Sequence, residues 1–227
     1  MEVLRADGVF TPPSINGSML YPGNVGGMNW SGGAFDPRNQ IFVTNVNSMM
    51  VESHLIPRDQ FDEKANASRG FGIEFAEQNG TPYGMSRIFL RSSFPGLPCS
   101  PPPWGSLVAV DLSTGAIKWS VPLGNILRFL HLPLSDPGWG TPNLGGSIVT
   151  AGGLVFVSGT LDPYFRAFDI DTGRLLWETQ LPAGGNATPM TYRVRENGKQ
   201  YLVIAAGGHG KLGTKLGDSL VAYALPE

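Results

Sequence analysis

One eleven-residue stretch occurs twice in this chain, and its repetition limits what the chain can fold into. Residues 109–119 read Ala-Val-Asp-Leu-Ser-Thr-Gly-Ala-Ile-Lys-Trp, and residues 167–177 read Ala-Phe-Asp-Ile-Asp-Thr-Gly-Arg-Leu-Leu-Trp. Both copies fit the pattern Ala-x-Asp-x-x-Thr-Gly-x-x-x-Trp, and they lie 58 residues apart at both ends. Self-similarity of this kind at a fixed period indicates a repeat architecture.

The pattern describes a strand, a tight turn and a second strand. Ala-x-Asp ends the first strand, and the aspartate carboxylate can accept hydrogen bonds from backbone N–H groups of the turn. Gly115 and Gly173 close the two turns, because glycine adopts positive φ at little cost. Trp119 and Trp177 are large, flat side chains that can pack between neighbouring sheets. The repeat therefore predicts antiparallel sheets, each fastened to the next by a tryptophan.

The rest of the chain extends this all-β pattern. Glycine (31 residues) and proline (19) are frequent, and charged residues make up only 15% of the chain. No window shows sustained helical spacing of apolar residues. We predict an all-β fold, a partial β-propeller built from four-stranded blades with tryptophan-docking repeats. The predicted parts are a degenerate blade at about 26–46, a long excursion at 46–103, and blades at about 104–122, 143–180 and 187–227.

Two segments interrupt the predicted repeat. The first, 46–103, is rich in turns and small polar residues, and loops of such length are usually functional when they occur in a compact domain. A short helix is expected near 58–65. The second excursion, 123–142, carries Pro133, Pro137 and Trp139. Before the first excursion, Ala34-Phe-Asp36 resembles a degenerate start of the repeat.

Composition excludes several classes of function. The net charge of −2 leaves no basic footprint for nucleic acid. The single cysteine, Cys99, excludes an internal disulfide and a metal-binding pair, and His54, His131 and His209 lack metal-type spacing. No apolar run is long enough to span a membrane, and the first residues do not resemble a signal peptide. Taken by itself, the sequence predicts a soluble, untargeted chain without nucleotide-binding or hydrolase motifs.

One glycine-rich motif, Gly207-Gly-His-Gly210, superficially resembles a phosphate-binding loop. It follows a predicted strand and leads into another strand, so no helix N-terminus is expected to hold an anion. Two interpretations of His209 remain at this point. It is either a loop histidine packed near the end of a sheet or a residue that faces a cofactor.

A further set of motifs resembles one family of enzymes. In chain order, the motifs are Gly26-Gly-Met-Asn-Trp30, Trp139-Gly-Thr-Pro-Asn-Leu-Gly-Gly146, Thr150-Ala-Gly-Gly-Leu-Val-Phe156, Leu181-Pro-Ala-Gly-Gly-Asn-Ala-Thr-Pro-Met-Thr-Tyr192 and Ala206-Gly-Gly-His-Gly-Lys-Leu-Gly-Thr-Lys-Leu-Gly-Asp218. With the tryptophan-ended repeat, they resemble the C-terminal part of the quinoprotein dehydrogenases. More narrowly, they are similar to the membrane-bound, pyrroloquinoline quinone (PQQ) enzymes that oxidise glucose, quinate or shikimate. The resemblance covers nearly the whole chain.

The resemblance implies an architecture and a chemistry. The family's propeller has eight blades, of which this chain would supply about half. It holds PQQ beside a divalent cation, calcium or magnesium, and passes electrons from the alcohol to ubiquinone. The family's catalytic base, PQQ-contacting lysine and metal ligands lie in the half that precedes this segment. The chain is therefore predicted to supply no catalytic residue and no metal ligand, and Asp36, Asp111 and Asp169 are interpreted as turn residues.

The resemblance also implies cofactor-binding residues. Asn45 matches a family asparagine that contacts PQQ, and a carboxamide can both donate and accept hydrogen bonds there. A strand-end residue that satisfies backbone groups is the other interpretation of Asn45. Asn29 and Trp30 lie in a family motif of the same blade, although Trp30 also fits a packing role. His209 completes the predicted set.

The sequence therefore predicts a chain that is incomplete by itself. Its partners would be the missing N-terminal half of the propeller or a second copy joined through open blade edges. A periplasmic location, with membrane attachment through the missing N-terminal region, follows from the resemblance. The alternative is a non-catalytic propeller-like scaffold, which would not be expected to need the two excursions. An alcohol dehydrogenase of the soluble quinoprotein branch is disfavoured by the ending that contains His209. Substrate identity is left open.

Overall fold

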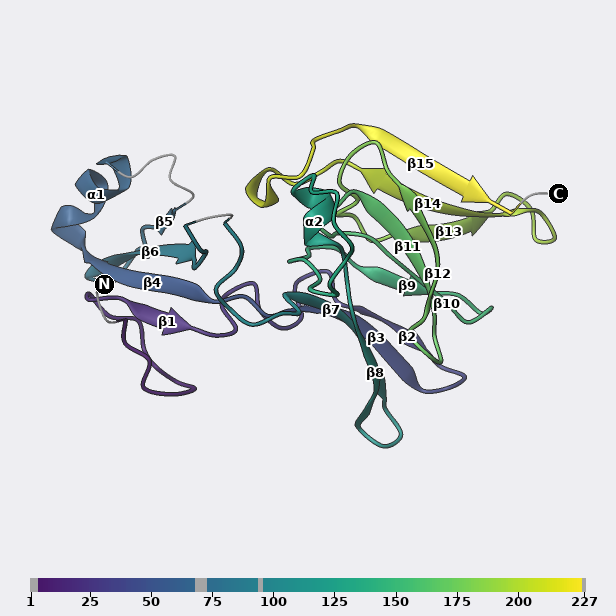
Figure 1. Ribbon diagram of the computed structural model, residues 1–227, viewed down its shortest axis with the longest axis horizontal. Coiled ribbons are helices and arrows are strands. Elements are labelled where there is room, and N and C mark those ends of the chain that lie inside the picture. Colours follow the sequence, from purple (N-terminus) through teal and green to yellow (C-terminus); the bar gives the residue numbers. More distant parts are fainter. Residues whose placement is uncertain (1–3, 68–72, 94–95, 226–227) are drawn as a thin grey trace. The chain divides into compact units, whose positions relative to one another are not determined.

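The computed structural model describes residues 4–67, 73–93 and 96–225. Within these ranges the chain is built mainly from antiparallel sheets and divides into two compact units (Figure 1). Unit 1 comprises Met1–Gly26 and Ser48–Pro101, and unit 2 comprises Gly27–Asn47 and Pro102–Glu227. The predicted all-β class is confirmed.

Unit 1 is a four-stranded antiparallel sheet in the order β1-β4-β6-β5. Its elements are β1 (Ser18–Leu20), β4 (Val51–Pro57), the 3-10 helix η1 (Arg58–Gln60), α1 (Phe61–Ala67), β5 (Glu74–Ala76) and β6 (Tyr83–Phe89). The helix expected near 58–65 is present. The remainder of the predicted excursion differs from expectation, because it contains a regular sheet.

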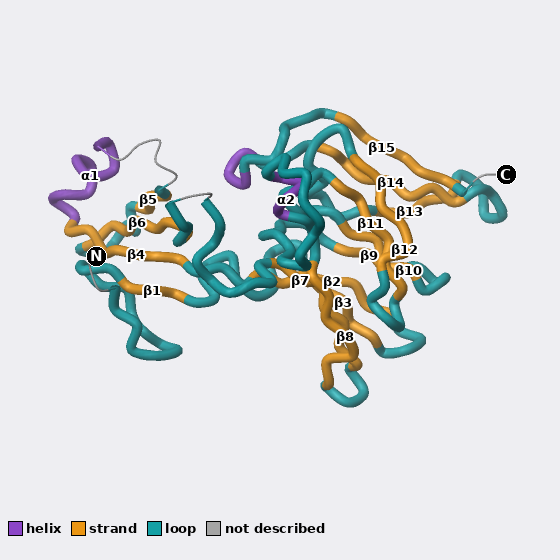
Figure 2. Tube along the Cα trace, viewed as in Figure 1, coloured by secondary structure: helices purple, strands orange, loops and turns teal. Residues whose placement is uncertain are grey.

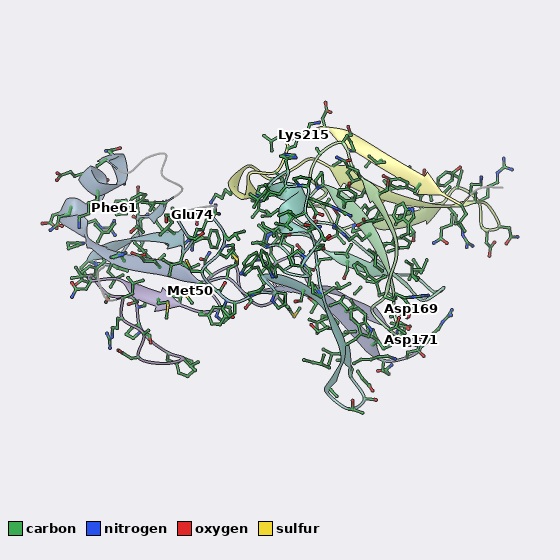
Figure 3. The ribbon with its side chains drawn as sticks, viewed as in Figure 1. Met50, Phe61, Glu74, Asp169, Asp171 and Lys215 are labelled. Carbon is green, nitrogen blue, oxygen red and sulfur yellow. The ribbon has the colours of Figure 1, made fainter. Side chains whose placement is uncertain are left out.

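Phe61 anchors α1 on the sheet of unit 1. Its buried ring meets the ring of Phe75 edge-on at a centroid distance of 6.2 Å. Gly84 in β6 makes this approach possible, since an added Cβ would lie 2.1 Å from the Phe61 ring. At the sheet edge, Glu74 accepts a hydrogen bond from Arg87 at 2.6 Å; Figure 3 labels Phe61 and Glu74. The segment between the repeats thus has a small core of its own.

Unit 2 contains three antiparallel sheets, which we call the first, second and third sheets. Their strand orders are β2-β3-β7-β8, β12-β11-β10-β9 and β13-β14-β15. The elements are β2 (Gly33–Asp36), β3 (Ile41–Asn47), β7 (Gly105–Asp111), β8 (Ala116–Pro122), α2 (Ile126–Phe129), β9 (Ser147–Val149), β10 (Leu154–Val157), β11 (Tyr164–Asp169), β12 (Leu175–Gln180), β13 (Met190–Arg193), β14 (Gln200–Ala206), the 3-10 helix η2 (Gly210–Leu212) and β15 (Ser219–Ala224).

The first sheet differs from the predicted blade boundaries. The segments 26–46 and 104–122, assigned to two blades, contribute two strands each to one sheet, because β3 pairs with β7 from Ile41↔Asp111 to Asn47↔Gly105. Asp36 therefore ends the first strand of its sheet, whereas Asp169 ends the third strand of the next. The interpretation of Ala34-Phe-Asp36 as a degenerate start of the repeat was therefore wrong. Local strand-turn chemistry is the same in both places, and only the pairing partner distinguishes them.

The two repeat turns have the predicted chemistry. The Asp111 carboxylate accepts from the backbone N–H and the hydroxyl of Ser113, and Asp169 does the same with Thr172. These hydroxyl hydrogen bonds are the main reason that the pKa of each aspartate lies below its ordinary value. Figure 3 shows Asp169 together with Asp171 at the turn that follows β11. Asp111 and Asp169 therefore stabilise the turns that follow them, as the sequence predicted.

Trp119 fastens the first sheet to the second. Its indole N–H donates to the carbonyl of Ile170 at 2.8 Å, and the side chain is only 9% exposed. The ring lies against Gly173, where an added Cβ would come within 2.7 Å of it. Lys118 adds an ion pair to Asp171 at 2.9 Å. The tryptophan of one repeat thus packs on the Thr-Gly turn of the next, as predicted.

We expect Gly173→Ala to destabilise unit 2 more than Gly115→Ala. Both glycines have positive φ, 70° and 74°, so alanine costs about 1–2 kcal/mol at either position. Only Gly173 meets the Trp119 ring, whereas nothing lies within 4 Å of a Cβ at Gly115. The overpacking adds about 1–3 kcal/mol at Gly173. Urea unfolding followed by circular dichroism measures the difference, and equal losses would contradict the docking contact.

The second and third sheets share another apolar core. Its buried members come from both sheets and the segments beside them: Phe165, Leu181, Ala183, Leu202, Ile204 and Ala206. Trp177 occupies the position in β12 that Trp119 occupies in β8, and its ring meets Tyr223 of β15 edge-on at 5.4 Å. It is 37% exposed, and among the described residues its indole N–H has no acceptor. The second copy of the docking contact is therefore only partly made.

The strand connections of unit 2 fall at two ends of its sheets. Short turns join β2 to β3, β7 to β8 and β11 to β12 at one end. The longer connections leave from the other end, where Asn47 pairs with Gly105, Val157 with Arg166 and Ala206 with Ser219. Figure 2 shows these longer loops in teal beside α2. We call this the connection end of unit 2.

Candidate functional site

Asn45 lies in β3 near the connection end, and its carboxamide is buried. The residue is 3% exposed, and its Nδ2 donates to Oδ1 of Asn143. Its own Oδ1 is buried and has no hydrogen-bond partner among the described residues. A buried carbonyl oxygen without a donor is costly and calls for an explanation. The Asn45 side chain therefore lacks one hydrogen-bond donor, at Oδ1, within the described residues.

Asn143 is the centre of a small asparagine cluster. It is fully buried, and its backbone N–H donates to Oδ1 of Asn47 at 2.8 Å. The Asn47 carboxamide returns a hydrogen bond to the Asn143 carbonyl, also at 2.8 Å. The backbone of Asn47 pairs with that of Gly27 in both directions. The cluster of Asn45, Asn47 and Asn143 therefore holds three chain segments together.

The motif that carries Asn143 lies directly on β7. Trp139 accepts from the backbone N–H of Trp104 at 2.8 Å, and their rings meet at a centroid distance of 5.6 Å. Gly105 allows this contact, because an added Cβ would lie 1.9 Å from the carbonyl oxygen of Thr141. The second excursion is thus fixed to the first sheet at the connection end. This places the Asn143 side chain against Asn45.

Asn29 and Trp30 lie in the loop before β2. The Asn29 side chain accepts from the backbone N–H of Trp30 at 2.8 Å, and its carbonyl accepts from Gly32 at 3.0 Å. The Trp30 side chain is 76% exposed, so it does not serve as a packing residue within the described part of unit 2. Within the same residues, no hydrogen bond or ring contact joins either of them to Asn45 or His209. Their predicted role toward the cofactor therefore stays a prediction.

His209 lies in the connection between β14 and β15. Its backbone N–H donates to the Thr214 hydroxyl at 2.8 Å, and its Nδ1 is buried without a partner among the described residues. The loop folds back tightly, since Gly208 donates to the Gly184 carbonyl and Gly184 donates to the Lys215 carbonyl. Figure 3 labels Lys215 at this end of β15. His209 is thus a loop histidine with one ring nitrogen still unused.

A buried ionic network lies near the same end of the second sheet. Arg166 pairs with the fully buried Asp162 and reaches Glu178 at 3.3 Å, and Glu178 binds Arg128 of α2 at 2.8 Å. Burial acts to lower the pKa of Arg128. The hydrogen bond and negative charge of Glu178 act in the opposite direction and are the main reason that this pKa lies above its ordinary value. The Arg128 guanidinium stacks over Tyr164 at 4.4 Å. A cavity of about 300 Å³ adjoins this network. The network ties α2 to the second sheet.

The sequence predicted Asn45 but not the residues around it. Asn143 lies within a motif that was recognised, but no role was assigned to this residue. Asn47 belongs to no motif, and the sequence predicted no function for it. Knowledge of the pairing of β3 with β7 would have indicated that Asn47 and Asn143 lie near Asn45, because the pairing brings the connections of both strands to one end of the sheet. The two strands are separated by 57 residues, 48–104, and no local sequence pattern records their pairing.

Comparison with known proteins identifies the family. The family model described as "PQQ: Glucose/ethanol/alcohol dehydrogenase, beta-propeller domain" matches residues 1–202. The chain belongs to this family. The tryptophan-ended repeat and the stacked antiparallel sheets of unit 2 are thus those of a quinoprotein propeller, and the resemblance stated from the sequence is confirmed.

Individual relatives agree with the family assignment. The chain is 47% identical to a quinoprotein glucose dehydrogenase A of Acinetobacter calcoaceticus, covering 99% of this chain and 28% of that protein. It is 38% identical to a quinate/shikimate dehydrogenase (quinone) of Acinetobacter baylyi, covering 98% and 28%. The chain thus spans less than a third of these relatives and corresponds to a C-terminal part.

A solved structure supports the fold. A europium-containing methanol dehydrogenase superposes with a TM-score of 0.61 over 91% of this chain and 34% of that one, at 23% sequence identity.

Within the described residues, no group of three or more histidine, cysteine, aspartate and glutamate side chains could hold a metal ion. In the same part of the chain, no helix is long and apolar enough to cross a membrane.

The residues present fit one side of a PQQ site. PQQ carries a ring N–H and quinone oxygens, so it offers both a donor and acceptors. The Oδ1 of Asn45, which has no donor among the described residues, is an acceptor that suits such an N–H. A buried carboxamide whose oxygen has no donor among the described residues is compatible with a residue that contacts a cofactor. The predicted role of Asn45 toward the cofactor is compatible with this chemistry and stays a prediction.

Proposed function

We propose that this chain forms the C-terminal section of a PQQ-dependent dehydrogenase that oxidises a sugar or polyol of the glucose, quinate or shikimate type. The family assignment and the relatives support the class of enzyme. The single observation in this chain that carries the proposal is the buried Asn45 carboxamide, whose Oδ1 has no donor within the part of the chain that the structure describes. PQQ, when bound, supplies the two-electron oxidation itself, and the protein positions it.

The role proposed for this section is binding and orientation. Asn45 would hold the cofactor by its carboxamide, with Asn29, Trp30 and His209 as further neighbours. Trp30 is well placed for this by its exposure, because a large flat ring in contact with solvent is free to meet a ligand. The catalytic base and the ligands of a divalent cation, calcium or magnesium, would come from the preceding part of the protein. The second excursion, 123–142, would form a loop at the mouth of the site.

The third sheet supports the proposal that more protein covers it. One of its faces packs on the second sheet, and the other face presents Met190, Tyr192 and Leu220, the last of them 75% exposed. Its outer strand β15 has no further strand beside it among the described residues. An open apolar face and a free edge favour association with another sheet. The remaining propeller blades are the partner we propose, and a second copy of this chain is the alternative.

The electron acceptor and location belong to the same proposal. One relative's name specifies a quinone acceptor, so we propose that electrons pass to ubiquinone. Ubiquinone dissolves in membranes, and a periplasmic enzyme attached to the membrane through its N-terminal region would reach it.

The cofactor proposal is tested by replacing Asn45 in a complete enzyme. We define a hybrid protein in which this chain replaces the matching C-terminal part of the Acinetobacter calcoaceticus enzyme. Asn45→Ala removes the carboxamide and leaves Asn143 without its donor, so PQQ should bind about tenfold more weakly, a loss of about 1–2 kcal/mol. Fluorescence titration of PQQ in the presence of calcium measures the affinity.

The control for this test is Asn39→Ala. Asn39 lies in an exposed turn and donates only to Asp36, at 2.9 Å. This variant should leave PQQ affinity unchanged. Equal affinities for Asn45→Ala and the unmutated hybrid would contradict the proposed site.

A further inference from the structure

We infer that Asn143 is a positioning residue, which fixes how the Asn45 carboxamide is presented to the cofactor. This inference rests on the proposed function. A carboxamide has two faces of similar shape and opposite hydrogen-bonding character, the oxygen and the NH2 group. Which of the two is turned toward a ligand depends on the groups that hold the other one. In this chain Asn45 Nδ2 is held by Asn143 Oδ1.

The anchoring of Asn143 makes it suited to this role. It is fully buried, and both of its backbone polar groups are held by the Asn47 carboxamide at 2.8 Å. Its own Nδ2 points to the carbonyl of Thr141 at 3.5 Å, which leaves its Oδ1 as the group that faces Asn45. A rigid acceptor opposite Asn45 attracts the NH2 group and repels the oxygen. The orientation of Asn45 is therefore set by a neighbour whose own orientation is fixed.

The consequence is a defined polarity at the cofactor wall. With its Nδ2 bonded to Asn143, Asn45 has a buried Oδ1 without a partner among the described residues, and a ligand N–H or O–H would supply the missing donor. The amide would then need no rotation when the ligand binds, because Asn143 already holds its NH2 group. Without Asn143, the carboxamide would sample both orientations and reach other partners. Asn143 thus acts through Asn45 and does not itself need to touch the cofactor.

A double-mutant cycle in the hybrid protein separates this role from a purely structural one. Asn143→Ala should weaken PQQ binding about fivefold to tenfold when Asn45 is present. In the Asn45→Ala background the same change should weaken it less than twofold, because there is no carboxamide left to orient. Asn143→Asp retains an oxygen that accepts from Asn45 Nδ2, so its affinity should recover to within about threefold of the unmutated hybrid.

Asn47→Ala supplies the structural control. It removes the two side-chain hydrogen bonds to the Asn143 backbone but retains both the Asn45 and the Asn143 side chains, so their hydrogen bond can still form. It should lower the urea unfolding midpoint at least as much as Asn143→Ala does, with a smaller effect on PQQ affinity. If alanine at position 143 prevents folding, Asn143→Leu keeps the volume, removes the acceptor and gives the same comparison.

The outcomes distinguish this inference from the proposed function. Equal losses of affinity from Asn143→Ala with and without Asn45 would overturn the positioning role and leave the proposed function standing. Failure of the unmutated hybrid to bind PQQ, or unchanged affinity in Asn45→Ala, would overturn the proposed function and the positioning role with it.

Discussion

Replacing Trp119 with alanine is expected to lower the free energy of unfolding of unit 2 by about 3–5 kcal/mol. The side chain lies in the core between the first and second sheets, together with residues of β3, β7, β10 and β11. Its removal leaves a cavity and also deprives the Ile170 carbonyl of its indole donor. Urea unfolding followed by far-ultraviolet circular dichroism measures the loss.

Trp177→Ala provides the matched comparison in the same chain. Trp177 stands at the same position of the repeat, but it is 37% exposed and its indole N–H has no acceptor among the described residues. We expect a loss of about 1–2 kcal/mol, because less apolar surface is buried. Equal losses from the two variants would contradict the claim that only the first docking contact is fully made. Trp119→Phe, which keeps most of the packing, replaces Trp119→Ala if the latter does not fold.

The repeat explains why so much of unit 2 could be predicted. Its eleven residues specify a strand, an aspartate-capped turn, a glycine with positive φ and a docking tryptophan, and each of these is determined by local chemistry. Gly173 adds a long-range constraint to the local one, since it meets the Trp119 ring. The Asn197-Gly198 pair in the turn between β13 and β14 is local chemistry of the same kind, because Asn-Gly favours tight hairpin turns.

The composition of the first sheet could not be predicted in the same way. β3 and β7 are separated by an entire folded unit, so their pairing depends on contacts that no local pattern records. The strands β4 and β6 were missed because they alternate with turns and small polar residues. Their burial depends on the core around Phe61 and on one another. A long polar insertion was thus interpreted as a loop where it forms a sheet.

The candidate site shows the same division. Asn45 was predicted because it stands in a motif that resembles a family position. The asparagine cluster around it could not be predicted, because Asn47 and Asn143 meet only when the second excursion folds back on β7. The unpaired Oδ1 of Asn45 is a property of that packing rather than of the sequence.

The second large effect concerns turnover. The isolated chain spans less than a third of its relatives, and we propose that the catalytic base and metal ligands come from the remaining part. It is therefore expected to show no glucose or quinate oxidation above the rate of PQQ alone. Joined to the remainder of the Acinetobacter calcoaceticus enzyme, the same residues should support glucose oxidation. Loss of one transition-state partner alone commonly costs a factor of about 10²–10³ in rate, so the contrast between the two proteins should be larger still.

Dye-linked glucose oxidation by these two proteins, each supplied with PQQ and calcium, tests the central claim most directly. The account predicts turnover by the hybrid and none by the isolated chain. Robust turnover by the isolated chain would contradict the claim that most of the active site lies elsewhere. A folded hybrid without turnover would contradict the claim that this chain supplies the C-terminal section of such an enzyme.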